Sequence, residues 1–313
     1  MAFPPPPYPQ GRDLLADRTV VVTAAAGTGI GYAVARRCIE EGASVLISDL
    51  HERRLGEAAE RLGSETGSTP ATLVCDVTDE ATVQELFRGA VDELGRIDVL
   101  MNNAGVMACP FGHTADGFEM QFGTNHLGHF ELTRLLTPAV VAGDAPRIVN
   151  LSSAAHGIAD VDLDDPNFER TEYNEWVAYG RSKSANALHA LALASRLAGD
   201  GVLAYSVHPG GIMTNLGRHL NDDLMQQMLT RAQERAEKAG ESGGMQFKSI
   251  PQGAATQVWA ATSPDLVDHS GAYLADCGLG VEGGNTGRNG FEPYIADTST
   301  ADRLWDLSER FLA

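Results

Sequence analysis

Hydrophobic residues follow two alternating patterns along the chain. Short runs rich in β-branched residues are too brief for helices and predict strands at residues 19–23, 45–49, 72–76, 97–101, 147–151, 202–207 and 272–275. Longer amphipathic stretches between them predict helices at residues 30–41, 53–62, 80–94 and 116–141, and one more around Tyr179. Strands alternating with helices of this length indicate βαβ units. We therefore expect an α/β fold with a doubly wound parallel sheet of about seven strands and helices on both faces.

No break in composition divides the chain, so we expect one domain over residues 15–313 after a flexible proline-rich tail at 1–14. Two segments depart from the regular alternation. Residues 157–176 are acidic and contain aromatic side chains, while residues 215–248 begin amphipathic and become highly polar. Long segments inside a compact domain are usually binding loops or lids, so we interpret 215–248 as a substrate lid. The alternative is a plain solvated helix.

Composition and charge exclude several classes of function. The 313 residues are 43% hydrophobic and carry a formal net charge of −19, and such a surface repels nucleic acid and anionic membranes. No apolar run could span a bilayer and the N-terminus lacks the regions of a signal peptide, so we expect no membrane anchor. The four cysteines lie far apart without metal-ligand or redox spacing, which is typical of reduced thiols in a cytoplasmic protein.

Tyr179 and Lys183 are the first candidates for chemistry. They stand four residues apart in a predicted helix, which puts both side chains on one face about one turn apart. The positive charge of a nearby ammonium favours phenolate, so we expect a lowered pKa for Tyr179. A phenol tuned in this way can exchange a proton with an alcohol or a carbonyl. The same spacing also arises by chance in many helices, so the motif needs support from the rest of the chain.

A glycine-rich turn at residues 24–31 follows the first predicted strand and opens the first helix. Glycines at this place let the backbone approach a pyrophosphate, which the free N–H groups and the dipole of the helix N-terminus favour. Asp49 follows at the end of the second strand, where a carboxylate can accept hydrogen bonds from ribose hydroxyls and repel a 2′-phosphate. The turn and Asp49 together predict NAD(H) as cofactor. Asp49 could instead cap the next helix.

The ordered set of motifs resembles the short-chain dehydrogenase/reductase family over about residues 15–280. The matching residues are the glycine loop, Asp76-Val77, Asn102-Asn103-Ala104-Gly105, Asn125, Ser152-Ser153, Tyr179 with Lys183, Pro209-Gly210 and Thr214. The resemblance implies a Rossmann fold, with Asp76 and Val77 bracketing the adenine and Ile212 and Thr214 holding the carboxamide end of the nicotinamide. The expected cofactor contacts are then Ala25, Gly27, Thr28, Gly29, Ile30, Gly31, Asp49, Leu50, Asp76, Val77, Asn103, Ala104, Gly105, Tyr179, Lys183, Pro209, Gly210, Ile212 and Thr214.

Further motifs are similar to the retinol-dehydrogenase-like branch of that family. They are residues 124–130, 152–156, 179–186, 208–210, 252–256, 271–277 and 303–305. Two features differ. The branch often has Cys-Arg after the second strand, where this chain has Asp49-Leu50, and that change favours NAD(H). The family usually has Thr-Gly at the start of the glycine loop. Here either Ala25 stands in the place of the first glycine or the turn holds one extra residue.

The resemblance implies hydride transfer between a nicotinamide and a carbinol or carbonyl carbon. Tyr179 would be the general acid–base, Lys183 would tune it and bind the nicotinamide ribose, and Ser153 would hold the substrate oxygen. Asn125 would hold a water that connects Lys183 to solvent. A non-catalytic nucleotide sensor of the same fold and an NADP(H)-dependent ketoreductase are the alternatives.

For the remaining histidines, packing inside the protein is set against a role in binding metal or substrate. His126 and His129 are spaced three apart but lack a third ligand, so we expect packing and no metal site. His156 and His208 lie near the active-site end of the sheet and could either touch substrate or pack. Apolar residues on additional faces of the 116–141 and Tyr179 helices, among them Leu188 and Ala192, together with the habit of the family, suggest a homodimer or homotetramer. The substrate we expect is an apolar alcohol or ketone.

Overall fold

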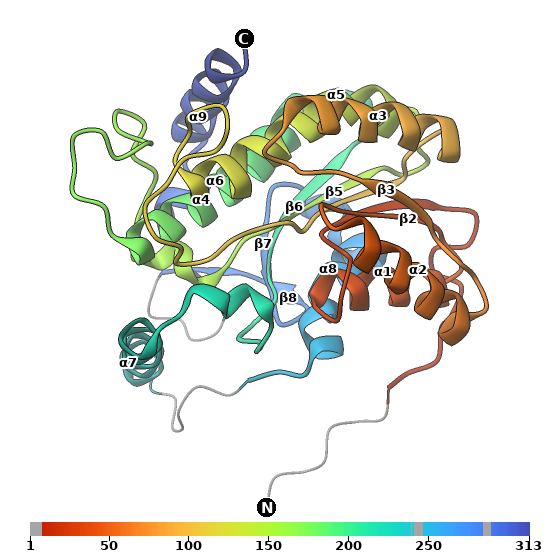
Figure 1. The fold of residues 1–313 in the computed structure, drawn as a ribbon, viewed down its shortest axis with the longest axis horizontal. Coiled ribbons are helices and arrows are strands. Elements are labelled where there is room, and N and C mark those ends of the chain that lie inside the picture. The colour runs from red at the N-terminus through yellow and green to blue at the C-terminus, as the bar shows by residue number, and fades with distance from the viewer. Residues whose placement is uncertain (1–7, 239, 241–246, 284–288) are drawn as a thin grey trace, which may run out of the picture.

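A mostly parallel sheet forms the centre of the molecule in the computed structural model (Figure 1). The structure describes residues 8–238, 240, 247–283 and 289–313. The strand order is β3-β2-β1-β4-β5-β6-β7-β8, and only the last pairing, β7 with β8, is antiparallel. The strands are β1 Thr19–Thr23, β2 Ser44–Asp49, β3 Ala71–Val74, β4 Val99–Asn102, β5 Arg147–Leu151, β6 Leu203–His208, β7 Tyr273–Ala275 and β8 Gly278–Leu279.

The sheet confirms the α/β fold predicted from the sequence, with one strand more than expected. The two-residue β8 is too short to leave a hydrophobic pattern, and it pairs with β7 across a tight turn at Asp276 and Cys277, both with positive φ. A smaller sheet pairs β9 Val281–Glu282 with β10 Gly290–Phe291.

The helices cover both faces of the sheet because side chains alternate along each strand. In β1, Val20 and Val22 enter the core on one face and Val21 enters the core on the other. The first face carries α1 Ile30–Glu40, α2 Glu52–Thr66 and α8 Ile250–Thr262, and the second carries α3 Glu80–Leu94, α5 Gly128–Val141 and α6 Glu175–Arg196 (Figure 1). Short helical turns are η2 Ala154–Ile158, η3 Ala198–Asp200, η4 Asn215–His219, η5 Pro264–His269 and η7 Pro293–Ala296.

The helix predicted at 116–141 is wrong in its first part. The chain instead makes a turn in which Thr114 pairs with Phe118 and His113 bridges Glu119, and helix α4 Met120–Phe122 starts after it. The Glu119 carboxylate ends that turn because it accepts hydrogen bonds from the N–H groups of Gln121 and Phe122. A π-helical turn, η1 Gly123–Leu127, then leads into α5. Such turns are often found at functional sites.

The C-terminal helix α9 Thr298–Phe311 packs on α6 and changes the interpretation of its apolar side chains (Figure 1). Leu188 and Ala192 were expected to face another subunit. They are buried in one cluster with Ala301 and Leu304 of α9, so the same chain covers this surface. The homo-oligomer stays a prediction, but these residues do not support it.

Two segments expected to be loosely attached contact the domain. Residues 8–14 of the proline-rich tail lie against α1, where the Tyr8 hydroxyl bonds the Glu40 carboxylate at 2.7 Å and the Arg12 N–H bonds Glu41 at 2.7 Å. The lid segment forms η4 and helix α7 Asp222–Lys238; residues 1–7, 239 and 241–246 of these two predicted segments lie outside the described residues. No helix within the described ranges is both long and apolar enough to cross a membrane.

Candidate active site

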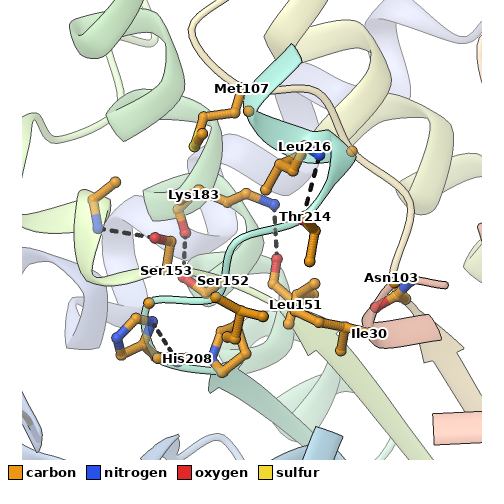
Figure 2. Close-up of a pocket in the computed structure, with 18 of the residues that line it drawn as sticks. Ile30, Asn103, Met107, Leu151, Ser152, Ser153, Lys183, His208, Thr214 and Leu216 are labelled. Atoms are coloured by element: carbon orange, nitrogen blue, oxygen red, sulfur yellow. Dashed lines mark hydrogen bonds between the residues drawn. The ribbon is translucent and has the colours of Figure 1, made fainter. Parts of the chain in front are cut away.

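A large cleft opens at the edge of the sheet where the parallel strands end. Its volume is about 1740 Å³, and it runs from Asp49 past the glycine loop to Ser153, Tyr179 and Lys183 and on to helix α7. The close-up shows Ser153, Lys183 and His208 at one end and Ile30 and Asn103 at the other (Figure 2). The carboxyl ends of the strands are the usual ligand site of a doubly wound sheet.

The glycine loop leaves room beside the N-terminus of α1. A Cβ added at Gly27 or Gly29 would meet nothing within 4 Å, whereas one at Gly31 would lie 2.5 Å from the Ala24 carbonyl oxygen. Gly31 is therefore needed for packing, and the other two glycines face open space. The N-cap residue Gly29 has no side chain to satisfy the first N–H groups of α1. Free N–H groups beside open space suit a pyrophosphate.

The start of the glycine loop is joined to the turn after β4. The Thr23 hydroxyl oxygen accepts hydrogen bonds from the N–H groups of Asn103 at 2.9 Å and Ala104 at 3.1 Å. Ala24, directly after it, has the left-handed φ of 52° that a glycine would adopt without strain. The expected cofactor contact of Ala25 stays a prediction that the structure does not support. Its methyl group is 0% exposed, and Ala25 is not among the residues that line the cleft.

Asp49 lies at the end of β2 and faces the cleft. Its carboxylate accepts hydrogen bonds from the N–H of Ala26 in the glycine loop at 3.2 Å and from the N–H of His51 at 3.1 Å. It does not cap α2, whose N-cap residue is His51. Burial raises the pKa of Asp49, opposed by the hydrogen bond from Ala26 and the charge of Arg54. A carboxylate can accept about four hydrogen bonds, so acceptor sites remain for ribose hydroxyls.

The other residues expected to hold a dinucleotide also line this cleft. They are Thr28, Ile30, Leu50, Asp76, Val77, Asn103, Ala104, Gly105, Pro209, Gly210, Ile212 and Thr214. The open loop, the free helix N-terminus and the carboxylate of Asp49 together fit a nicotinamide dinucleotide, whose nicotinamide would carry the hydride when bound.

Tyr179 and Lys183 lie on one face of α6, as their spacing predicts, and both line the cleft. The Lys183 Nζ is 5.7 Å from the centre of the Tyr179 ring and donates a hydrogen bond to the Leu151 carbonyl at 3.0 Å (Figure 2). The expected lowering of the Tyr179 pKa is wrong for this structure. Burial raises the pKa of Tyr179 to about 12, although the Ser153 hydroxyl acts in the opposite direction. Burial also lowers the pKa of Lys183 to about 7.

The two serines after β5 have different tasks. The Ser152 hydroxyl donates to the Lys183 carbonyl at 2.7 Å and so ties the strand end to α6 (Figure 2). Ser153 lines the cleft, and its hydroxyl accepts a hydrogen bond from the Ala155 N–H at 3.1 Å. Since a hydroxyl keeps one hydrogen to donate, Ser153 can hold a substrate oxygen.

Asn125 supports the site from below and does not line the cleft. It lies in the π-helical turn, where its side chain accepts from the Val106 N–H at 2.8 Å and donates to the Val106 carbonyl at 3.0 Å and to the Ser182 hydroxyl at 2.8 Å. Its own carbonyl accepts a hydrogen bond from His129 Nδ1 at 3.0 Å. The described contacts therefore make Asn125 a link between the turn after β4 and α6.

The histidines of η1 and the first turn of α5 are packing residues. His126 and His129 are fully buried, and burial lowers the pKa of His126 to about 3 and that of His129 to about 4. Within the described part of the chain, no three His, Cys, Asp or Glu side chains are grouped so that they could hold a metal ion. All four cysteines, each in a described range, are free thiols.

Several cleft residues were not named individually from the sequence, although Trp176, Leu220 and Arg235 lie in the two segments expected to be binding loops. Trp176 and Leu220 lie with Tyr179 and Met107 in one apolar cluster, so the substrate end of the cleft has a hydrophobic wall. Arg54 lines the adenosine end near Asp49, and Arg235 reaches in from α7. These side chains come from separate elements, and only their position in the fold brings them to the cleft.

Comparison with known proteins agrees with this site. The family model described as short chain dehydrogenase matches residues 18–225, more than half of the chain. The chain therefore belongs to the short-chain dehydrogenase family and is an oxidoreductase that transfers hydride between a nicotinamide nucleotide and an alcohol or ketone.

Individual relatives confirm the resemblance to retinol dehydrogenases. Retinol dehydrogenase 14 of Mus musculus is 37% identical over 307 residues, which is 95% of this chain and 86% of the relative. A probable oxidoreductase of Streptomyces lividans is 37% identical over 300 residues, 93% of this chain and 96% of the relative. The crystal structure of a putative uncharacterized protein from Mycobacterium Paratuberculosis superposes with a TM-score of 0.70 at 31% identity, covering 95% and 94% of the two chains.

Proposed function

We propose that the protein is an NAD(H)-dependent dehydrogenase that interconverts a lipophilic alcohol and its ketone or aldehyde, with Tyr179 as general acid–base. The observation that carries the proposal is a single cleft with the Asp49 carboxylate at one end and Ser153, Tyr179 and Lys183 at the other. The residues that line the cleft between these two ends are those expected to contact a dinucleotide.

In this mechanism the Ser153 hydroxyl donates a hydrogen bond to the substrate oxygen and Tyr179 exchanges a proton with it. With its raised pKa, Tyr179 is a neutral phenol at neutral pH, the form that donates a proton in carbonyl reduction. Oxidation requires Tyr179 to lose that proton first. The pKa of Lys183 near 7 means that this side chain can release its own proton close to physiological pH.

The cofactor preference depends on two side chains of opposite charge. Asp49 favours NAD(H), since its carboxylate would meet a 2′-phosphate at close range. Arg54 lines the same end of the cleft and supports the alternative, an NADP(H)-dependent ketoreductase. We favour NAD(H) because the hydrogen bond from the Ala26 N–H holds the Asp49 carboxylate beside the glycine loop.

Titration of the purified protein with NADH and NADPH, followed by nucleotide fluorescence, tests this preference. We expect NADH to bind more tightly than NADPH. Asp49→Ala should reduce the ratio of the two dissociation constants about tenfold, because a carboxylate that repels the 2′-phosphate is lost. Tighter NADPH binding to the unaltered protein would contradict the role of Asp49. Arg53→Met, in an exposed residue of the same helix outside the cleft, is the control.

The substrate class follows from the apolar wall of Met107, Trp176 and Leu220, and the match to retinol dehydrogenases supports it. A panel of apolar alcohols with NAD, monitored by NADH absorbance, should reveal turnover. Tyr179→Phe should abolish this turnover and leave NADH binding nearly intact. Turnover that survives the change would exclude Tyr179 as the acid–base. NADH binding by the unaltered protein without any turnover would favour the alternative, a non-catalytic nucleotide sensor.

The cellular setting and assembly that we propose come from the sequence. The net charge of −19 and the four free cysteines support a cytoplasmic enzyme without nucleic acid as partner. A homodimer or homotetramer remains part of this proposal.

A further inference from the structure

The main chain around Ser153 is held by side chains from its own short turn, from the end of β6 and from helix α7. Ser153 follows β5 and caps the short turn η2. Two peptide groups matter: the one joining Ser153 to Ala154, and the one joining Ala154 to Ala155. Each has a partner at both its C=O and its N–H. The partners are the side chains of Ser153, His156, His208 and Arg235 and, at the Ser153 carbonyl, also the main-chain N–H of His156.

The first peptide group lies between two histidines. His156 Nδ1 is 2.7 Å from the Ser153 carbonyl, and since a carbonyl only accepts, Nδ1 carries the hydrogen. Its Nε2 then accepts from the Glu292 N–H at 3.2 Å. His208 Nδ1 accepts from the Ala154 N–H at 3.1 Å, so this ring carries its hydrogen on Nε2. The two histidines hold opposite ends of one peptide group in opposite tautomers.

The surroundings of both imidazole rings keep them uncharged. Burial lowers the pKa of His156 to about 4 and that of His208 to about 3, and the charge of Arg235 acts in the same direction on each. The pattern of donors and acceptors around this peptide therefore stays the same over the physiological range of pH.

The second peptide group connects the lid helix to the Ser153 hydroxyl. Arg235 of α7 donates from Nη1 to the Ala154 carbonyl at 3.1 Å and from Nη2 to the Gly290 carbonyl at 2.7 Å. The N–H of the same peptide group, that of Ala155, is the donor to the Ser153 hydroxyl oxygen at 3.1 Å. One rigid peptide plane thus separates the guanidinium on α7 from the hydroxyl that faces the substrate.

We propose that His156, His208 and Arg235 are positioning residues that fix the Ser153 hydroxyl, and that Arg235 makes its position depend on helix α7 being seated on the cleft. This inference rests on the proposed role of Ser153 as the group that holds the substrate oxygen. The Ala155 N–H occupies one acceptor site of the Ser153 hydroxyl and leaves the hydroxyl hydrogen free to donate into the cleft. Without the Arg235 contact, the plane that carries this N–H loses its anchor.

The first test measures whether these side chains restrain the main chain around Ser153, and it requires no enzymatic turnover. Hydrogen–deuterium exchange of the peptide containing residues 151–158 should be about tenfold faster in Arg235→Met and in His208→Leu than in the unaltered protein, because each change frees one end of a peptide group. Arg53→Met removes an exposed arginine with one ion pair on α2 and should leave this exchange unchanged. Equal exchange in Arg235→Met and the unaltered protein would overturn the proposal.

If Arg235→Met does not fold, Arg235→Lys decides the matter. A single ammonium can replace one of the two contacts, so it should give exchange and kcat between those of the unaltered protein and His208→Leu. Values equal to those of the unaltered protein would show that the paired contact is not needed, and would contradict the proposal.

The second test asks whether the Arg235 contact affects turnover through Ser153. Arg235→Met should lower kcat about tenfold with unchanged NADH affinity, and the same change in a Ser153→Ala background should cost no more than about twofold. Equal losses in both backgrounds would show that Arg235 acts elsewhere and would overturn the inference. If the unaltered protein oxidises no alcohol in the panel, the proposed function fails, and the exchange measurement still decides whether the hold exists.

Discussion

Lys183 and Asn186 donate hydrogen bonds to one oxygen, the main-chain carbonyl of Leu151, at 3.0 Å each. The two side chains come from the same face of α6 and meet the strand end that precedes Ser153. Lys183 is almost fully buried, and within the described residues no carboxylate forms an ion pair with it. The ammonium is therefore desolvated without a counter-charge, which explains the fall of its pKa to about 7.

Replacing this lysine should stabilise the fold and destroy activity. Lys183→Met keeps the volume of the side chain and removes the buried charge, while Asn186 still satisfies the Leu151 carbonyl. We expect the free energy of unfolding at pH 7 to rise by roughly 1–3 kcal/mol and turnover to fall below detection. Urea denaturation measures the first quantity, and a lower stability would contradict the cost assigned to the buried ammonium.

The pH dependence of this effect has a definite sign. The folded pKa of Lys183, about 7, lies below its ordinary value of 10.5, so between these two values the unfolded chain binds more protons. Stability therefore rises with pH in this window, and below it the Lys183 contribution is constant. The gain in stability of Lys183→Met over the unaltered protein should accordingly shrink from pH 7 to pH 10.

Ala24 offers a second prediction about stability. Its φ of 52° lies in the left-handed region, which a Cβ makes unfavourable by roughly 1–2 kcal/mol. Ala24→Gly should remove this strain, and after allowance for the greater freedom of glycine in the unfolded chain we expect a net gain of about 0.5–1 kcal/mol. The matched control is Ala25→Gly, which loses a fully buried methyl group and should be destabilising. Thermal unfolding of the two variants should move in opposite directions; movement in the same direction would refute the strain.

The sequence predicts those parts of the structure that depend on local patterns. Strands β1 and β5 and helix α3 lie at the predicted residues, because β-branched runs and a capping Asp79 are local signals. The family resemblance implied that Ser153, Tyr179 and Lys183 share one site, and all three line the same cleft.

Features that depend on distant contacts could not be foreseen. The π-helical turn carrying Asn125 is stabilised from Val106 and Ser182, and nothing in its own residues signals it. The Arg235 contact to Ala154 joins residues 81 positions apart. The pKa of Tyr179 was expected to fall because of Lys183, but spacing alone does not reveal that the phenol is buried, and burial raises its pKa.

Asp98 carries a third prediction. Its carboxylate accepts hydrogen bonds from the N–H groups of Thr19 at 2.7 Å and Asp144 at 2.5 Å and from Arg96 at 3.1 Å, at the start of the central strands. Burial acts to raise the pKa of Asp98, but these hydrogen bonds hold it below the ordinary value. Asp98→Asn puts an amide donor against N–H donors, so we expect a loss of roughly 2–4 kcal/mol in the free energy of unfolding at pH 7.

The effect of Asp98→Asn should fade in acid. Because the folded pKa is lowered, the stabilisation is fully present above the ordinary pKa and is lost as the pH falls through the folded value. Urea denaturation at pH 7 and pH 3 should therefore show a smaller difference between the two proteins at pH 3. Asp144→Asn, in a side chain that is 69% exposed, is the control and should change stability by less than about 0.5 kcal/mol. An equal loss for both variants would contradict the role of the Asp98 carboxylate.

Helix α9 provides the last prediction, which bears on assembly. Leu304 is 1% exposed and packs with Leu188 and Ala192, the residues that would otherwise form an apolar surface on α6. Leu304→Ala should lower the free energy of unfolding by about 2–5 kcal/mol because it leaves a cavity between the two helices. Leu14→Ala, at a position that is 52% exposed, should cost far less. Since α9 of the same chain covers this surface, sedimentation should give the same oligomeric state for the folded Leu304→Ala variant and the unaltered protein. A change of oligomeric state would show that this face of α6 takes part in subunit contacts.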